Sequence, residues 1–197
     1  MCDERHPGGY RVYSAQGRWA ATRAGSSGAR AGFSRGAVCT TWQSMGWREL
    51  TEDDDDRVVE HMLGLYAEDP APAPVSAEQC RRTLQRLRAE RVRGVAIGWQ
   101  GPHGLAGYAI LCSFWSNELG GEVCIIDELF VAPGERGRGH ATELVQGLCA
   151  RQLPWFRDAV AVELEVTPGN ERARQLYERL GFRPYKNALM RAARARG

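Results

Sequence analysis

Three glycines and two arginines are grouped in segment 131–141, whose sequence is VAPGERGRGHA. The segment follows an apolar run with the length of a buried strand and precedes the start of a helical pattern. Glycines allow backbone N–H groups to turn toward a ligand without obstruction by a Cβ atom, and a helix N-terminus adds partial positive charge. The segment therefore predicts a loop that binds a pyrophosphate group.

Other phosphate-binding and nucleic-acid-binding motifs fit this loop poorly. A P-loop requires Gly-Lys-Ser/Thr, whereas the only lysine of the chain is Lys186. A dinucleotide fingerprint has the spacing G-x-G-x-x-G, whereas Gly134, Gly137 and Gly139 give G-x-x-G-x-G after segments with an antiparallel pattern. An RNA-binding RGG segment would repeat, and this one does not.

Two motifs, in this order, resemble those of the GNAT acetyltransferase superfamily. Residues 136–141 (RGRGHA) match its signature R/Q-x-x-G-x-G/A, and residues 170–182 (NERARQLYERLGF) match its second motif, N-x-x-A-x-x-L-Y-x-x-x-G-F. The resemblance covers roughly residues 46–190. It implies a mixed α/β (α+β) domain, with a mostly antiparallel sheet flanked by helices on both faces, and acetyl-CoA as cosubstrate without a metal. Segment 126–131 (IDELFV) is also similar to diamine and small-amine N-acetyltransferases.

The resemblance implies which residues hold acetyl-CoA. The pantetheine arm would pair like an extra strand with residues 129–131, whose backbone N–H groups would also stabilise the oxyanion. Asn170 is first of all a helix N-cap and only secondarily a contact of the cosubstrate or acceptor. The complete set that we expect to bind acetyl-CoA is Leu129, Phe130, Val131, Arg136, Gly137, Arg138, Gly139, His140, Ala141, Thr142 and Asn170.

Acetyl transfer to an amine requires a base for the ammonium and a proton donor for the departing thiolate. By resemblance, Tyr177 is the general acid. Since a phenol has a pKa near 10 and a thiol one near 8.5, this role requires a lowered pKa or a hydrogen bond to the sulfur. Asp127 and Glu128 are the candidate bases, directly or through water, or they pair structurally with arginine. Strand alternation predicts that these two side chains lie on opposite faces, and the diamine resemblance favours Asp127.

The acceptor site is expected where the first helix ends. Family members often form the acceptor mouth there, which implies contacts from Tyr66 and Glu68. Trp115 and the turn at 116–121 are expected to form the opposite wall, and Asp127 to contact the substrate.

Hydrophobic periodicity places these residues on an element order β-α-α-β-β-β-α-β-α-β, which is a mixed α/β class. Thr51 is the expected cap of the first helix, and Ser76 with Gln79 forms a capping box for the second. Segment 122–131 is the expected central strand, and Gly181 ends the helix that carries Tyr177.

Charge is distributed unevenly along the 197 residues, which carry a net charge of +2. Segment 1–44 holds six arginines, Asp3 and Glu4, so its net charge is +4 and that of the remainder is −2. An acidic body argues against nucleic acid as the main partner. No run reaches 18 apolar residues, which argues against a membrane-spanning helix. The six scattered cysteines contain no C-x-x-C pair and favour a reducing, cytoplasmic location.

We expect residues 1–44 to be a flexible or disordered extension and residues 45–197 to be the acetyltransferase domain. A transit peptide, or sequence upstream of a start at Met45, would look similar. The expected activity is acetyl-CoA-dependent N-acetyl transfer to a primary amine of a cationic small molecule by direct attack in a ternary complex. A peptide or protein acceptor is the alternative, and a non-catalytic acyl-CoA sensor is a rival of a different class. A homodimer is left open.

Overall fold

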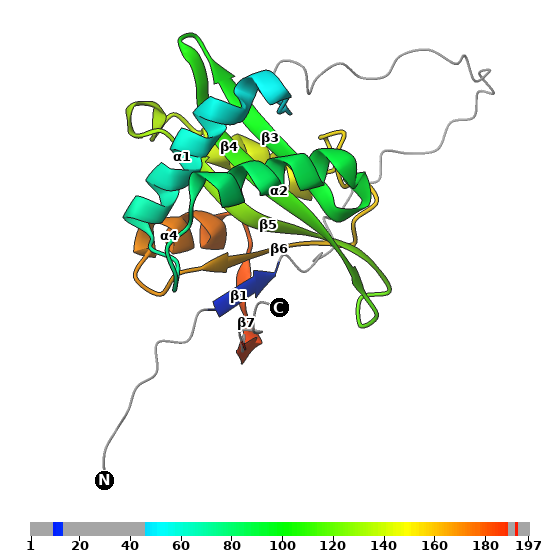
Figure 1. The fold of residues 1–197 in the computed structure, drawn as a ribbon. Coiled ribbons are helices and arrows are strands. Elements are labelled where there is room, and N and C mark those ends of the chain that lie inside the picture. Colours follow the sequence, from blue (N-terminus) through cyan, green and yellow to red (C-terminus); the bar gives the residue numbers. More distant parts are fainter. Residues whose placement is uncertain (1–9, 14–45, 189–191, 193–197) are drawn as a thin grey trace, which may run out of the picture.

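The strand that carries Asp127 and Glu128 lies near the middle of the sheet (Figure 1). The computed structural model describes residues 10–13, 46–188 and 192. The strands are β1 (Tyr10–Tyr13), β2 (Trp47–Glu49), β3 (Gly94–Gly101), β4 (Gly104–Ser116), β5 (Gly121–Val131), β6 (Ala161–Val166) and β7 (Arg183–Ala188). The helices are α1 (Asp55–Glu68), α2 (Ala77–Ala89), α3 (His140–Cys149) and α4 (Glu171–Arg179), with short 3-10 turns η2 (Glu52–Asp54), η3 (Arg91–Arg93) and η4 (Pro133–Glu135).

The seven described strands form one sheet in the order β2-β3-β4-β5-β6-β1-β7. All neighbours are antiparallel except β5 and β6, which are joined through α3. A parallel pair requires such a crossover connection. The predicted mixed, mostly antiparallel fold class is therefore confirmed, as is the predicted element order from β2 to β7.

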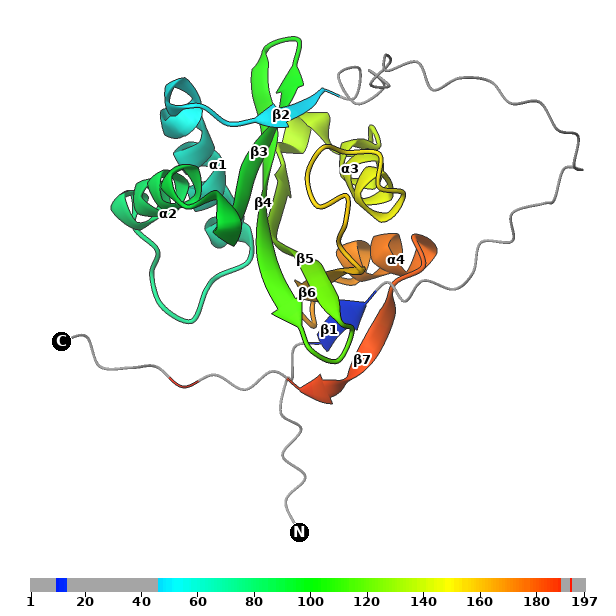
Figure 2. The ribbon, with the colours of Figure 1, turned by 90° about the vertical axis from the view of Figure 1, so that its right-hand side faces the viewer.

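Helices cover both faces of the sheet (Figure 2). Helices α1 and α2 pack on one face through buried side chains such as Met62 and Leu84, together with Tyr108 and Phe130 of the sheet. Helices α3 and α4 cover the other face, where Leu144 and Tyr177 belong to a second apolar cluster. The sheet therefore separates the α1/α2 layer from the α3/α4 layer.

Asp127 is an extra residue in the pairing of β5 with β4. Ile110 lies opposite Glu128, whereas the next residue, Leu111, lies opposite Ile126. Such a β-bulge shifts the alternation of side chains by one residue. Consequently Ile126 packs with the α3/α4 cluster, whereas Phe130, four residues further on, packs with the α1/α2 cluster.

Strands β5 and β6 pair only over Val123–Ile126 and Ala161–Leu164. Beyond Ile126, the described residues of β5 have no strand partner on the β6 side. The backbone N–H of Ala132 donates to the Ala106 carbonyl on the β4 side. Since N–H groups alternate in direction along a strand, those of Leu129 and Val131 point to the β6 side. Although β5 is a central strand, the backbone of its carboxyl-terminal half is therefore unpaired on the β6 side. We call this unpaired side the free edge of β5.

The N-terminal segment contributes a strand to the sheet. Within residues 1–44 the structure describes only Tyr10–Tyr13, and these form β1 between β6 and β7. These four residues lie within the sheet, with a paired strand on each side. The rest of the expected extension lies outside the described residues, and the boundary at residue 45 stays a prediction.

Candidate active site

A cavity of about 410 Å³ opens beside the unpaired half of β5, between the glycine-containing loop and α4. Among the residues that we expected to bind acetyl-CoA, only Arg138 is absent from its lining. Those that line it are Leu129, Phe130, Val131, Arg136, Gly137, Gly139, His140, Ala141, Thr142 and Asn170. Tyr177 and Glu68 also line it. The two sequence motifs, which are about 30 residues apart in the chain, therefore contribute to one cavity.

The loop at the start of α3 can receive an anion. Gly137 and Gly139 have φ angles of +80° and +92°, which side-chain-bearing residues rarely adopt. Apart from each glycine and its immediate chain neighbours, no atom of the described residues lies within 4 Å of the position that a Cβ would take there. Gly139 is also the N-cap of α3 and offers no side chain to bind the first N–H groups of the helix. Those N–H groups are free of intrahelical partners and suit a pyrophosphate.

The two arginines of the loop are both paired with carboxylates. Arg136 donates from Nη2 to both carboxylate oxygens of Glu68, at 2.7 and 2.9 Å, and from Nε to the Val131 carbonyl at 2.7 Å. Arg138 donates to Glu135 at 2.8 Å. In this structure, therefore, a cosubstrate phosphate that bound either guanidinium would meet a carboxylate already paired with it. Glu68 thus contacts the glycine loop, and its contact with an acceptor stays a prediction.

Arginines of α4 were missed by the sequence reasoning. Arg172 and Arg179 line the cavity, and neither side chain has a hydrogen bond or ion pair with a described residue. They are seven residues apart, which places them on one face of a helix. The spacing of Arg172, Leu176 and Arg179 indicated in the sequence that they share one face of a helix. It did not indicate that this face lines the cavity.

Glu128 is held by two tyrosines on the α1/α2 side of the sheet. Tyr108 of β4 donates to Oε2 at 2.7 Å, and Tyr66 of α1 donates to Oε1 in a short hydrogen bond. Burial raises the pKa of Glu128 above its usual range, whereas the two phenols act in the opposite direction. A carboxylate in this environment is a stronger base than an exposed one. Tyr108 was missed, because the register that places it here cannot be read from the sequence.

Asp127 is exposed, but it lies near the same groups. After burial, the charges of Asp127 and Glu128 contribute to raising the pKa of the Cys112 thiol to about 11. Cys112 packs against the α1/α2 cluster. Glu128, which contacts Tyr66 and Tyr108, lies on this side of the sheet. The bulge at Asp127 interrupts the alternation from which opposite faces were predicted for the two carboxylates.

Tyr177 lies on the α3/α4 side, 8% exposed, with its ring 5.7 Å from that of Phe182. No described group hydrogen-bonds its hydroxyl. Burial raises the pKa of Tyr177 to about 12, which is opposite to the lowered pKa that an efficient acid would need. Asn170 accepts a hydrogen bond from the Ala173 N–H at 3.1 Å, so it caps α4 as expected while it lines the cavity.

Of the predicted site residues His140 and Trp115, only His140 lines the cavity. The His140 ring stacks on Trp99 with centroids 3.6 Å apart, and its Nε2 lies 3.6 Å from a Glu135 oxygen. Trp115 is 70% exposed and pairs with Glu122. It is five residues from Ile110, the partner of Glu128, which corresponds to roughly 17 Å along a strand. Trp115 therefore lies at a distance from Glu128 along β4, and its role in the acceptor site stays a prediction.

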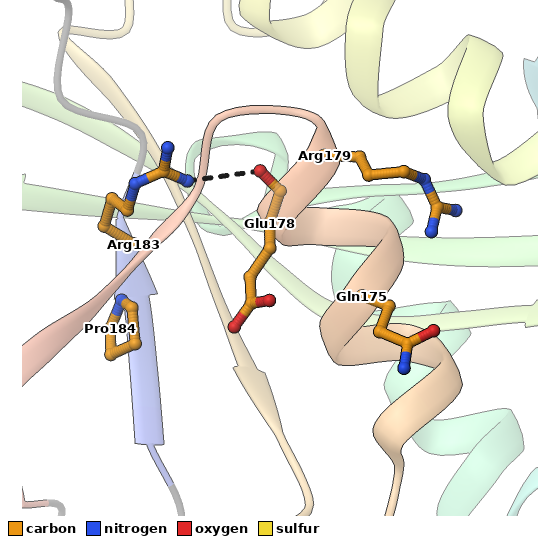
Figure 3. A pocket seen from close by; sticks show the side chains of 5 residues that line it. All are labelled: Gln175, Glu178, Arg179, Arg183 and Pro184. Atoms are coloured by element: carbon orange, nitrogen blue, oxygen red, sulfur yellow. Dashed lines mark hydrogen bonds between the residues drawn. The ribbon is translucent and has the colours of Figure 1, made fainter.

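A second hollow lies between α4 and β7 (Figure 3). It is lined by Gln175, Glu178, Arg179, Arg183 and Pro184, and Arg183 donates to the Glu178 main-chain carbonyl at 3.2 Å. None of the residues that line it is a glycine. Among the described residues there is also no cluster of His, Cys, Asp and Glu that could hold a metal ion, and no helix long and apolar enough to cross a membrane.

Comparisons with known proteins agree with this geometry. An acetyltransferase of Trypanosoma brucei is 27% identical, with a TM-score of 0.55 over 75% of this chain and 97% of its own. A predicted acetyltransferase of Clostridium acetobutylicum, solved with acetyl-CoA, is 16% identical, with a TM-score of 0.60 over 74% and 94%. An integron cassette protein from the Cole Harbour Salt Marsh metagenome is 22% identical, with a TM-score of 0.60 over 82% and 98%. No curated protein matches the chain.

The model of the acetyltransferase (GNAT) family matches residues 51–182, from the start of η2 to the end of the second motif. This match spans most of the chain and includes the loop, β5 and α4. The family uses acetyl-CoA, which fits the open glycine loop and the strand edge of β5. The chain therefore belongs to the GNAT acetyltransferase family and is an N-acetyltransferase.

Proposed function

We propose that the protein transfers the acetyl group of acetyl-CoA to a primary amine of a cationic small molecule, by direct attack in a ternary complex. The observation that carries the proposal is the position of Glu128. This partly buried carboxylate lies on the α1/α2 side of β5, next to the gap between β5 and β6, while the cosubstrate cavity lies beside the same gap. The two reactants would therefore meet from opposite sides of the sheet.

Acetyl-CoA would be bound by backbone groups. The N–H groups at the start of α3 would bind the pyrophosphate, with Arg172 and Arg179 as nearby cations. The free edge of β5 at residues 129–131 would hold the pantetheine arm as an additional strand. The Leu129 N–H, which points to this edge, would donate to the carbonyl oxygen as negative charge develops there. One such donor contributes about 2.7–4 kcal/mol to transition-state stabilisation.

Glu128 would remove a proton from the acceptor ammonium, directly or through water. Tyr108 fixes one carboxylate oxygen, so the orientation of the base is set before the acceptor binds. Asp127, next to it and exposed, would attract the positive charge of the acceptor. These two acids, together with the acidic net charge of residues 45–197, support a cationic acceptor.

Tyr177 would act as a hydrogen-bond donor to the sulfur rather than as a full proton donor. Transfer from a phenol of pKa about 12 to a thiolate of ordinary pKa near 8.5 is unfavourable by roughly 5 kcal/mol. A hydrogen bond avoids this cost, because the thiolate can then take its proton from water after release. The hydroxyl has no partner among the described residues, so it is available for this contact.

The test is a panel of primary amines, peptides and amine-bearing antibiotics, incubated with purified protein and acetyl-CoA while CoA thiol release is followed. We expect turnover with small cationic amines. Turnover with peptides alone would favour the alternative acceptor, and tight CoA binding without turnover of any compound would contradict the proposal.

The scattered cysteines support a cytoplasmic location for the protein. Measurement of the mass of the purified protein in solution would show whether it is a homodimer.

A further inference from the structure

The end of α1, residues 65–69, contacts three parts of the site at once. Tyr66 donates to Glu128 of β5. Glu68 accepts two hydrogen bonds from Arg136 of the glycine loop, at 2.7 and 2.9 Å. Asp69 accepts a hydrogen bond from the Thr167 hydroxyl, between β6 and α4, at 2.6 Å. A single helical turn is thus attached to both sides of the gap between β5 and β6.

Arg136 is fixed from the loop side and available from the cavity side. Its Nε donates to the Val131 carbonyl, and its guanidinium carbon lies 5.4 Å from the centre of the Phe130 ring. These contacts orient the guanidinium, while its Nη2 donates to Glu68. Arg136 and Glu68 both line the cavity, with side-chain exposures of 31% and 48%. The pair is therefore accessible to a ligand that enters the cavity.

A carboxylate in this position opposes the binding of an anion. Glu68 neutralises the loop arginine that lies nearest to β5, and its own charge repels phosphate oxygens. Phosphate binds a guanidinium in the same bidentate fork that a carboxylate uses. The phosphate groups of acetyl-CoA and the carboxylate of Glu68 are thus alternative partners for one side chain.

Displacement of Glu68 would act on Glu128 through Tyr66. Glu68 and Tyr66 belong to the same turn of α1, whose last backbone hydrogen bond joins the Asp69 N–H to the Leu65 carbonyl at 2.8 Å. With Arg136 lost as a partner, this turn keeps only the Asp69–Thr167 and Tyr66–Glu128 contacts among those described above. The proposed base is therefore connected to the cosubstrate loop by a chain of direct contacts.

We propose that Glu68 competes with the phosphate groups of acetyl-CoA for Arg136, so that binding of the cosubstrate releases the end of α1 and withdraws the Tyr66 hydroxyl from Glu128. This inference rests on the proposed function, in which Glu128 is the base. It makes Glu68 a positioning residue, because it acts on the base through Tyr66. The consequence is that the Glu128 carboxylate keeps its hydrogen bond to Tyr66 while the cavity is empty and loses it when the cosubstrate is bound.

Calorimetry with CoA tests the competition directly. Glu68→Gln keeps the length of the side chain but removes its charge, and it should tighten CoA binding about 3- to 10-fold. The matched control is Glu60→Gln on the same helix, since Glu60 is exposed and pairs only with Arg57 among the described residues. This control should leave the affinity unchanged. Equal or weaker CoA binding by Glu68→Gln would overturn the competition.

Tyr66→Phe tests the coupling. Because coupling between two sites is reciprocal, a bond that breaks on CoA binding must weaken that binding when it is present. Removal of the Tyr66 hydroxyl should therefore tighten CoA binding about 2- to 5-fold. An unchanged affinity in Tyr66→Phe, with tighter binding in Glu68→Gln, would overturn the coupling to Glu128.

Hydrogen exchange provides a readout independent of catalysis. In the wild-type protein, addition of CoA should accelerate exchange in peptides that cover residues 65–69, whereas slower exchange would overturn the release. A failure of this inference can be distinguished from a failure of the proposed function. If the wild type binds CoA but these shifts are absent, only this inference fails; if it does not bind CoA, the proposed function fails as well.

Discussion

Tyr108 of β4 and Glu128 of β5 are diagonal neighbours in the sheet, and the Tyr108 hydroxyl donates to the Glu128 carboxylate at 2.7 Å. Both lie on the α1/α2 side of the sheet, because the bulge at Asp127 turns the residues that follow it toward that side. Without the extra residue, Glu128 would point toward α3 and α4. A one-residue irregularity in β5 thus places a carboxylate beside the gap where acetyl transfer is proposed.

Replacement of the proposed base should remove most of the activity. We expect Glu128→Gln to lower kcat/KM for the acceptor by about 10²- to 10⁴-fold, the usual contribution of a general base. The matched control is Asp127→Asn, which should cause a smaller loss, mainly through the KM of the acceptor. An equal or greater loss of kcat in Asp127→Asn would assign the base to Asp127 instead.

The pH profile should carry the signature of Glu128. Because the base must be deprotonated, activity is lost as the pH falls through its pKa, and burial raises that pKa above the usual carboxyl range. The acidic limb of kcat/KM should therefore lie at a higher pH than expected for an exposed glutamate. A limb at an ordinary carboxyl pKa, or its persistence in Glu128→Gln, would contradict this assignment.

Tyr177→Phe distinguishes hydrogen bonding from proton transfer. A neutral hydrogen bond contributes about 0.5–1.5 kcal/mol, so kcat should fall no more than about tenfold, with little change in CoA affinity. Since the pKa of Tyr177 is raised to about 12, no alkaline limb of kcat between pH 8 and roughly 10 should depend on it. A limb in that range that vanishes in Tyr177→Phe would show that Tyr177 acts as the acid after all.

Local patterns were enough to predict the loop and its helix, because a glycine with a positive φ and a helix N-terminus depend on neighbouring residues. Gly139 and Asn170 illustrate this, since each caps the helix that follows it. The partners of these elements could not be predicted in the same way. Arg136 and Glu68 are 68 residues apart in the sequence, and an arginine in a glycine loop looks the same whether or not a distant carboxylate neutralises it.

The register of the sheet was the second feature that could not be predicted from the sequence. Apolar residues on both faces of segment 122–131 correctly predict a central strand, but the bulge depends on pairing with β4 and is not visible in these residues themselves. The strand β1 at Tyr10–Tyr13 was missed for a similar reason. Four residues without apolar alternation on either side carry little local signal, and the strand gains its definition from β6 and β7.

A glycine substitution in the loop should weaken cosubstrate binding. Gly139 has a φ of +92° at the start of α3, and alanine there costs about 1–2 kcal/mol or forces the loop to rearrange. The added methyl group would also project into the open part of the cavity. We expect Gly139→Ala to weaken CoA binding about 5- to 30-fold in calorimetry. The control is Gly134→Ala, which lies outside the cavity lining and has no positive φ; an equal loss in that variant would contradict the prediction.

The arginines of α4 should contribute to the affinity for CoA through its phosphates. Arg172→Gln and Arg179→Gln should each weaken CoA binding, about 3- to 10-fold at low salt, and the difference from wild type should shrink as salt is added. Arg174→Gln is the control, because Arg174 pairs with Glu171 at 2.6 Å and does not line this cavity. If all three variants bind CoA equally well, the positive charge of α4 has no role in binding.

The ion pair at the start of α1 should make stability depend on pH in the acidic range. Arg48 donates to both carboxylate oxygens of Asp54 at 2.7 Å, and it is the main cause that lowers the pKa of Asp54 to about 2. A carboxylate whose pKa is lowered by folding stabilises the protein above its unfolded pKa, near 3.8, and this contribution is lost as the pH falls toward 2. Because Arg48 is 39% exposed, solvent screening reduces the contribution to about 1–2 kcal/mol.

Asp54→Asn should therefore lower the free energy of unfolding at pH 7 by about this amount, and the deficit should shrink between pH 4 and 2 as the wild type loses the same contribution. Chemical denaturation at several pH values measures both quantities. The matched control is Asp56→Asn, whose carboxylate is 88% exposed and pairs with an Arg81 that is itself half exposed. This control should change stability little at any pH, because an exposed pair contributes little. A deficit in Asp54→Asn that stays constant down to pH 2 would show that the carboxylate stabilises α1 through hydrogen bonds that the amide also loses, rather than through its charge.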